Sequence, residues 1–135
     1  PLLAIVIKAN SKGPVFFKQK RNGYNFKEFW CYKFRSMKLH DESTYEQTKE
    51  NDPRITKIGK FLRKTSLDEL PQLINIIRGE MSVVGPRPHA LAIDNKYCSK
   101  FLNYERRYSV RPGLTGLAQI KGFRGGDDFE SMKKR

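Results

Sequence analysis

The sequence has few residues of the kinds that build metal centres, disulfides or membrane spans. Its two cysteines, Cys31 and Cys98, and its two histidines, His40 and His89, show no metal-ligand spacing. We expect both cysteines to be reduced, in a protein that faces the cytosol. No segment approaches the ~20 apolar residues of a membrane-spanning helix. RNP, helix-turn-helix and zinc-finger signatures are also absent, so the sequence offers no support for those nucleic-acid-binding classes.

Acidic residues are scarce as well. The 135 residues include 14 Asp and Glu against 27 Lys and Arg, a formal net charge of +13. A hydrophobic content of 38% and an aromatic content of 12% predict one folded domain with a modest core. Three partners suit this charge: nucleic acid, an anionic membrane surface, or a phosphorylated small substrate. A basic, soluble surface without a special partner is the fourth interpretation.

Two short aromatic segments predict a β-hairpin. Residues 15–17 and 29–32 favour strands, and Asn22-Gly23 between them favours a tight turn. The apolar residues 1–7 fit either a core strand or the end of an apolar helix. Residues 40–53 are polar and acidic and are expected to form an exposed loop.

Hydrophobic spacing predicts several helices. Ile55, Ile58 and Leu62 recur at helical spacing in a basic amphipathic helix, and a second helix over 70–77 ends at Gly79. Further along we expect a rigid linker over 85–88, a helix over about 89–108, and a short strand or extended segment over 114–120. The expected fold is α+β: a small mixed domain with several amphipathic helices packed on a short β-hairpin.

The segment Ser66-Leu67-Asp68-Glu69-Leu70-Pro71 places two carboxylates side by side among many cations. One interpretation is helix-start chemistry, with Ser66 and Glu69 forming a capping box. The other is catalytic. Asp68 would attack phosphorus to give an acyl phosphate, and Glu69 would hold Mg²⁺ on the phosphate oxygens. The spacing alone favours neither.

Other cations have the same two interpretations. Lys33 and Arg35 alternate along an expected strand and so share one face. Arg87 lies between two prolines that restrict its backbone, which suits recognition of a phosphate at a low entropic cost. Arg111 precedes Pro112-Gly113. Each of these cations suits either a solvated surface or a phosphate site.

Taken together, these segments resemble the bacterial sugar transferase family, the monotopic phosphoglycosyl transferases. Six blocks occur in the family's order: Gly13-Pro14-Val15-Phe16-Phe17, Tyr32-Lys33-Phe34-Arg35-Ser36-Met37, Asp52-Pro53-Arg54-Ile55-Thr56, Ser66-Leu67-Asp68-Glu69-Leu70-Pro71, Gly79-Glu80-Met81-Ser82-Val83-Val84-Gly85-Pro86-Arg87-Pro88 and Arg111-Pro112-Gly113-Leu114-Thr115-Gly116. The sequence after Pro88, with Gly122-Phe123-Arg124-Gly125, is similar to the hexose-1-phosphate transferases of exopolysaccharide synthesis, which act on undecaprenyl phosphate.

The resemblance implies a reaction. Such enzymes transfer a sugar-1-phosphate from a UDP-sugar to polyprenol phosphate and release UMP, as the first membrane step of surface polysaccharide synthesis. The family's aspartate, matched by Asp68, forms a covalent phosphosugar intermediate, and Glu69 would be a Mg²⁺ ligand. Basic positions that would contact phosphate, nucleotide or lipid phosphate are Lys33, Arg35, Arg63, Arg87 and Arg111.

The resemblance also implies a place in the cell. It predicts one catalytic domain over residues 1–135 at the cytoplasmic face of the bacterial inner membrane, in contact with membrane lipid. Residues 1–8 would be the end of a re-entrant membrane helix, and the domain would be truncated at both ends. Nucleic acid is not an expected partner, and association into a homo-oligomer is left open. The alternative from another class is a non-catalytic basic module that binds nucleic acid or an anionic membrane surface.

Overall fold

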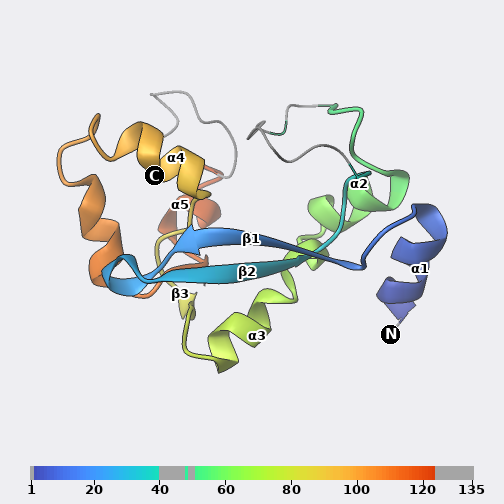
Figure 1. Cartoon of the computed structure of the whole chain (residues 1–135), viewed down its shortest axis with the longest axis horizontal. Helices are drawn as coiled ribbons and strands as arrows, with labels where there is room; N and C mark the ends of the chain where they lie inside the picture. Colours follow the sequence, from blue (N-terminus) through green and yellow to red (C-terminus); the bar gives the residue numbers. More distant parts are fainter. Residues whose placement is uncertain (1, 40–47, 49–50, 124–135) are drawn as a thin grey trace. The chain divides into compact units, whose positions relative to one another are not determined.

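The computed structural model describes residues 2–39, 48 and 51–123 (Figure 1). The chain divides into two compact units, each described here by itself. Residues 1–18 and 32–71 form the first, and residues 19–31 and 72–135 form the second. The described residues form helices, a two-stranded β1–β2 sheet and a parallel β3–β4 pair, which confirms the α+β prediction. Within the described ranges, no helix combines the length and apolar character that crossing a membrane requires.

The predicted hairpin is present as β1 (Phe16–Asn22) and β2 (Glu28–Phe34). Its connection is longer than the expected Asn-Gly turn. A short 3₁₀ helix, η1 (Tyr24–Phe26), lies between the strands, and Asn25 and Phe26 have φ values of 50° and 60°. Asparagine adopts this left-handed region more readily than most residues, so the turn centres on Asn25 rather than on Gly23.

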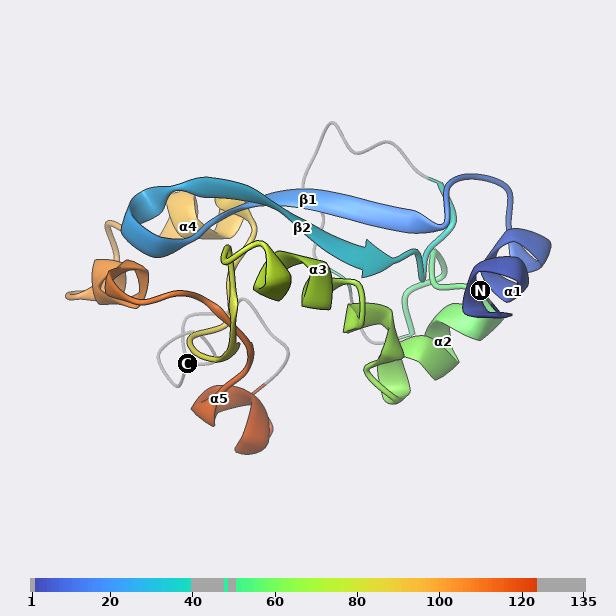
Figure 2. The same cartoon turned by 90° about the horizontal axis from the view of Figure 1, so that it is seen from below.

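The first unit contains α1 (Leu2–Asn10), α2 (Lys57–Lys64) and the 3₁₀ helix η2 (Leu67–Glu69). The apolar start of the chain is therefore a helix and not a core strand. Helices α1 and α2 lie side by side (Figures 1 and 2). Ile7 of α1 and Leu62 of α2 are fully buried and supply the apolar interior of this unit.

A close backbone contact fixes where α2 begins. The N-cap residue Thr56 accepts a hydrogen bond from the Gly59 amide at 3.0 Å, and its own amide donates to the Ser36 carbonyl at 3.1 Å. A Cβ atom on Gly59 would lie 1.9 Å from that same carbonyl oxygen. Only glycine permits this approach, so the helix starts at Lys57, later than its apolar pattern from Ile55 predicts.

The second unit contains α3 (Gln72–Ile77), β3 (Ser82–Val84), α4 (Leu91–Tyr97), the 3₁₀ helix η3 (Tyr104–Ser109), β4 (Gly113–Thr115) and α5 (Leu117–Ile120). Helix α3, which was predicted, lies beside β2 (Figure 2), where the Asn75 side-chain amide donates to the Trp30 carbonyl at 2.7 Å. One apolar cluster joins Phe29, Cys31 and Met81. A second cluster centres on Ile93 and Tyr97.

Two local predictions were wrong in part, and a third is tested at only a few positions. The helix expected over 89–108 is two pieces, α4 and η3, because Asn103 adopts a left-handed φ of 66° between them. The segment 114–120 holds the end of β4 and then α5. Residues 40–47 and 49–50 of the expected exposed loop lie outside the described residues. Asp52 in that loop is buried, 5% exposed, with its carboxylate 2.7 Å from the Arg54 guanidinium.

Candidate active site

The adjacent carboxylates Asp68 and Glu69 lie in η2, directly after α2 in the first unit. Ser66 adopts the left-handed region, with φ 59° and ψ 14°, and so reverses the chain at the end of α2. Pro71 has no amide hydrogen, so it cannot join η2 to α3 through a helical hydrogen bond. The two acids are thereby presented on a single isolated turn packed against α2.

This geometry contradicts the capping-box interpretation. An N-cap residue needs an extended backbone and a side-chain oxygen that accepts from the following amides. Ser66 is left-handed, and its side chain makes no cap hydrogen bond. In addition, α3 begins three residues after Glu69, at Gln72. Helix-start chemistry therefore does not explain why the two carboxylates are here.

A short ion pair connects β2 to the dyad. The Lys33 ammonium lies 2.7 Å from Glu69 Oε1, and the two side chains are only 17% and 15% exposed. The partners are 36 residues apart in the sequence, so tertiary structure alone brings them together. A largely buried pair of this kind holds both groups in a defined position.

Asp68 is buried, 8% exposed, with charged groups of both signs nearby that act on its pKa. Burial raises the pKa of the Asp68 carboxyl, and the neighbouring Glu69 carboxylate raises it further. The Lys33 ammonium and the Arg63 guanidinium oppose this and lower the pKa. A carboxylate with a raised pKa is a stronger nucleophile in its ionised form than an exposed aspartate, and the two cations favour that form.

Arg63 of α2 is held next to the dyad by Ser36. The Arg63 Nε donates to the Ser36 hydroxyl at 2.8 Å. Burial lowers the pKa of the Arg63 guanidinium, and the Asp68 carboxylate raises it, as does Asp52. The guanidinium stays charged at neutral pH because its ordinary pKa exceeds 12. Arg63 thus supplies a fixed positive charge beside Asp68.

Arg35 has different partners from Lys33. Strand β2 ends at Phe34, and the Arg35 side chain is buried, 6% exposed. Its guanidinium donates to the backbone carbonyls of Ser11, at 2.7 Å, and of Lys12. Arg35 therefore ties the chain after α1 to the end of β2. Its predicted phosphate contact stays a prediction.

Arg87 and Arg111 belong to the second unit, where the parallel strands bring their segments together. Ser82 pairs with Gly113 and Val84 with Thr115. Just beyond β3, the Gly113 amide donates to the Pro86 carbonyl at 2.9 Å. The structure thus places the segments of these two arginines side by side. Their proximity to Asp68 stays a prediction.

The carboxylates of η2 fit a divalent cation of the magnesium type. Asp68 and Glu69 supply oxygen donors, and a carboxylate can bind a metal through one oxygen while the other is ion-paired. Among the residues that the structure describes, no group of three His, Cys, Asp or Glu gathers as a dedicated metal site. Mg²⁺ is commonly held by one or two carboxylates together with substrate phosphates. This donor set therefore fits Mg²⁺ bound with a phosphorylated substrate.

Two contributors to the site were not predicted. Ser36 positions Arg63, and the buried Asp52 contributes to the field at Arg63. Both lie inside blocks that the sequence had marked, 32–37 and 52–56. Their position inside these blocks was the only signal in the sequence that they could belong to the site. That both act on Arg63 could be known only from the fold.

Comparison with known proteins is consistent with this geometry. The profile of the bacterial sugar transferase family matches residues 1–135, so the chain belongs to that family. The chain is 51% identical over 137 residues to "UDP-glucose:undecaprenyl-phosphate glucose-1-phosphate transferase" of Xanthomonas campestris pv. campestris, covering 98% of the chain and 28% of that protein.

Two further relatives carry related names. "Exopolysaccharide production protein PSS" of Rhizobium leguminosarum bv. phaseoli is 52% identical, over 93% of this chain and 66% of that protein. "Galactosyl transferase CpsE" of Streptococcus agalactiae serotype III (strain NEM316) is 46% identical, over 90% of this chain and 29% of that protein. The chain spans less than a third of the length of the Xanthomonas and Streptococcus relatives.

Proposed function

We propose that this chain is the catalytic part of a phosphoglycosyl transferase. It would transfer a hexose-1-phosphate from a UDP-sugar to polyprenol phosphate, at the cytoplasmic face of the bacterial inner membrane. The observation that carries the proposal is the buried Asp68, flanked by Lys33 and Arg63. The name of the Xanthomonas relative, which contains UDP-glucose and undecaprenyl phosphate, supports the choice of substrates.

The reaction has two displacements at one phosphorus atom. In the first, an Asp68 carboxylate oxygen bonds to the phosphorus that bears the sugar, and the bond from that phosphorus to UMP breaks. The product is an acyl phosphate that joins Asp68 to the phosphosugar, and UMP leaves. In the second, a phosphate oxygen of polyprenol phosphate attacks the same phosphorus, the carboxylate leaves, and a lipid-linked diphosphosugar forms.

The cations offset the charge that these steps bring together. A diphosphate approaching a carboxylate is repelled unless fixed positive groups stand nearby. Lys33 and Arg63 supply such groups in the first unit. When held by Glu69, Mg²⁺ would neutralise part of the phosphate charge. Arg87 and Arg111 are proposed to bind phosphate or nucleotide. The exposed apolar residues Leu2 and Ile5 of α1, 73% and 65% exposed, suit contact with membrane lipid.

The test is UMP release by the intact protein from UDP-glucose or UDP-galactose, with undecaprenyl phosphate as the acceptor. We expect turnover that requires Mg²⁺, and a loss of at least about 10³-fold in Asp68→Asn. Lys57→Ala, which removes an exposed lysine of α2, is the control and should keep its activity. No UMP release, together with salt-sensitive binding to vesicles or oligonucleotides that Asp68→Asn leaves unchanged, would support the non-catalytic basic module instead.

A further inference from the structure

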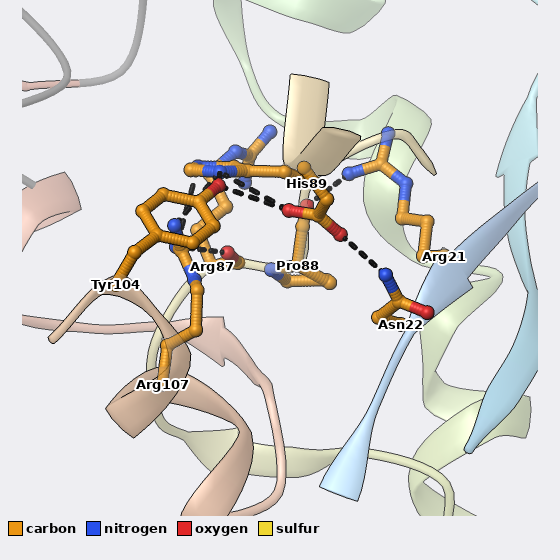
Figure 3. Close-up of polar contacts among 8 residues, drawn as sticks. Arg21, Asn22, Arg87, Pro88, His89, Tyr104 and Arg107 are labelled. Carbon is orange, nitrogen blue, oxygen red and sulfur yellow. Dashed lines mark hydrogen bonds and ion pairs between the residues drawn. The ribbon is translucent and has the colours of Figure 1, made fainter. Parts of the chain in front are cut away.

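A buried polar cluster in the second unit plays no part in the site described above. Figure 3 shows it between the end of β1, the start of α4 and η3. Asp94 and His89 are 1% and 4% exposed. The Tyr104 hydroxyl lies 2.7 Å from His89 Nδ1 and donates to Asp94 Oδ1 at 2.9 Å, and the Asn22 amide donates to Asp94 Oδ2 at 2.9 Å. Both carboxylate oxygens of Asp94 thus accept hydrogen bonds, as a buried charge requires.

Arg107 extends this cluster to the backbone of Arg87. One terminal nitrogen of its guanidinium lies 2.8 Å from His89 Nδ1, and the other donates to the Arg87 carbonyl at 2.9 Å. The guanidinium also lies 4.7 Å from the centre of the Tyr104 ring. From the opposite side, the Arg21 guanidinium donates to the Pro88 carbonyl (Figure 3). Two consecutive carbonyls are therefore held from two different elements.

We propose that Arg107 is a positioning residue that acts through Arg87. The proposal rests on the proposed function, in which Arg87 contacts phosphate or nucleotide. Pro86 and Pro88 restrict the backbone on either side of Arg87, and Arg107 fixes its carbonyl. The Arg87 side chain then has less conformational freedom to lose when it binds an anion. Because Arg107 uses both ends of its planar fork, a lysine could not make the same two contacts.

A purely structural role for Arg107 makes a different prediction. If it only holds η3 against α4, its substitution should lower the folded fraction, and it should lower kcat/KM by the same factor whether or not Arg87 is present. If it acts through Arg87, the cost should vanish once Arg87 is removed. A double-mutant cycle separates the two roles.

The experiment measures kcat/KM for the UDP-sugar in the intact protein. The variants are Arg107→Lys, Arg87→Ala and the double variant, with the exposed neighbour Arg106→Ala as the matched control. We expect Arg107→Lys to lower kcat/KM about tenfold, as the loss of one charged hydrogen bond does, and Arg106→Ala to leave it unchanged. In the Arg87→Ala background, Arg107→Lys should cost less than about twofold. Equal losses in both backgrounds, or no loss in either, would overturn the proposal.

A second measurement does not depend on activity. Amide hydrogen exchange over residues 85–90 should be faster in Arg107→Lys than in the parent and in Arg106→Ala, because the clamp on the Arg87 carbonyl is released. Unchanged exchange in this segment would overturn the proposal even if the protein turns over UDP-sugars. If the parent releases no UMP but exchange is still faster in Arg107→Lys than in the parent, the clamp is supported and only the proposed function is contradicted.

Discussion

Substitution of Lys33 by methionine tests the arrangement of the dyad most fully. Methionine keeps an unbranched chain but removes the ammonium that lies 2.7 Å from Glu69. Removing one partner of a buried ion pair costs about 3–5 kcal/mol in the free energy of unfolding, because the other charge is left without compensation. Since the two side chains keep 17% and 15% exposure, we expect the low end of that range, about 3 kcal/mol.

The matched control removes both charges. Lys33→Met/Glu69→Gln also removes the Glu69 charge that Lys33→Met leaves without its partner, while Arg63 still lies near Asp68, so it should recover most of the lost stability. Urea unfolding at pH 7 of the parent, both single variants and the double variant gives the comparison. If Lys33→Met costs less than about 0.5 kcal/mol, or if the double variant is no more stable than Lys33→Met, the pair is not the buried contact described here.

The same variant changes the pH dependence of the reaction. Burial raises the pKa of Asp68, and of the neighbouring charges that lower this pKa, Lys33 has the largest effect. Without it the pKa of Asp68 rises further, so a smaller fraction of Asp68 is ionised at a given acidic pH. The acid limb of the profile of kcat/KM against pH should therefore move to higher pH. An acid limb that stays in place would mean that Lys33 does not act on the attacking carboxylate.

Three further predictions concern other parts of the structure. Because burial raises the pKa of Asp68, the stability linked to this carboxyl is fully present below about pH 3.8 and is lost as the pH rises through the folded-state pKa. Asp68→Asn should therefore increase the free energy of unfolding at pH 7, and a gain that does not shrink towards pH 4 would contradict this. Ser36→Ala removes the hydroxyl that accepts a hydrogen bond from Arg63. It should lower kcat/KM about tenfold but the free energy of unfolding by only about 1 kcal/mol. If activity and the folded fraction in thermal melts fall in parallel, Ser36 does not act by positioning Arg63. Gly59→Ala should lower the free energy of unfolding by more than about 3 kcal/mol, because its Cβ would lie 1.9 Å from a carbonyl oxygen. The control Gly79→Ala, at φ 72° with no atom within 4 Å of the added Cβ, should lower it by about 1 kcal/mol. Similar losses for the two variants in urea unfolding would contradict the close contact.

Much of the local structure could be predicted from the sequence, because local patterns determine it. The aromatic segments gave the hairpin, and apolar spacing gave α2 and α3. The misses come from backbone conformations that composition does not reveal. Ser66 and Asn103 adopt positive φ. The first separates η2 from the preceding helix α2, and the second divides the expected helix over 89–108. Residue type permits such single-residue reversals, asparagine more readily than most, but tertiary packing decides at which positions they occur.

The candidate site shows the same division. Asp68 and Glu69 were identified from their adjacency among cations and from the family blocks. Their partners were not, since Lys33 reaches Glu69 across 36 residues. Arg35 was expected beside Lys33 on a strand, but β2 ends at Phe34, and the buried Arg35 binds backbone carbonyls instead. Alternation predicts a face only as far as the strand extends.

The clearest test is intact-protein mass spectrometry of the protein incubated with a UDP-hexose and Mg²⁺ in the absence of polyprenol phosphate. With no acceptor, the first displacement should leave a phosphohexose on the enzyme, and peptide mapping should place it on Asp68. Adding undecaprenyl phosphate should remove it, and Asp68→Asn should never acquire it. A folded protein that releases UMP without forming this adduct, or that carries it on another residue, would contradict the assignment of Asp68 as the nucleophile.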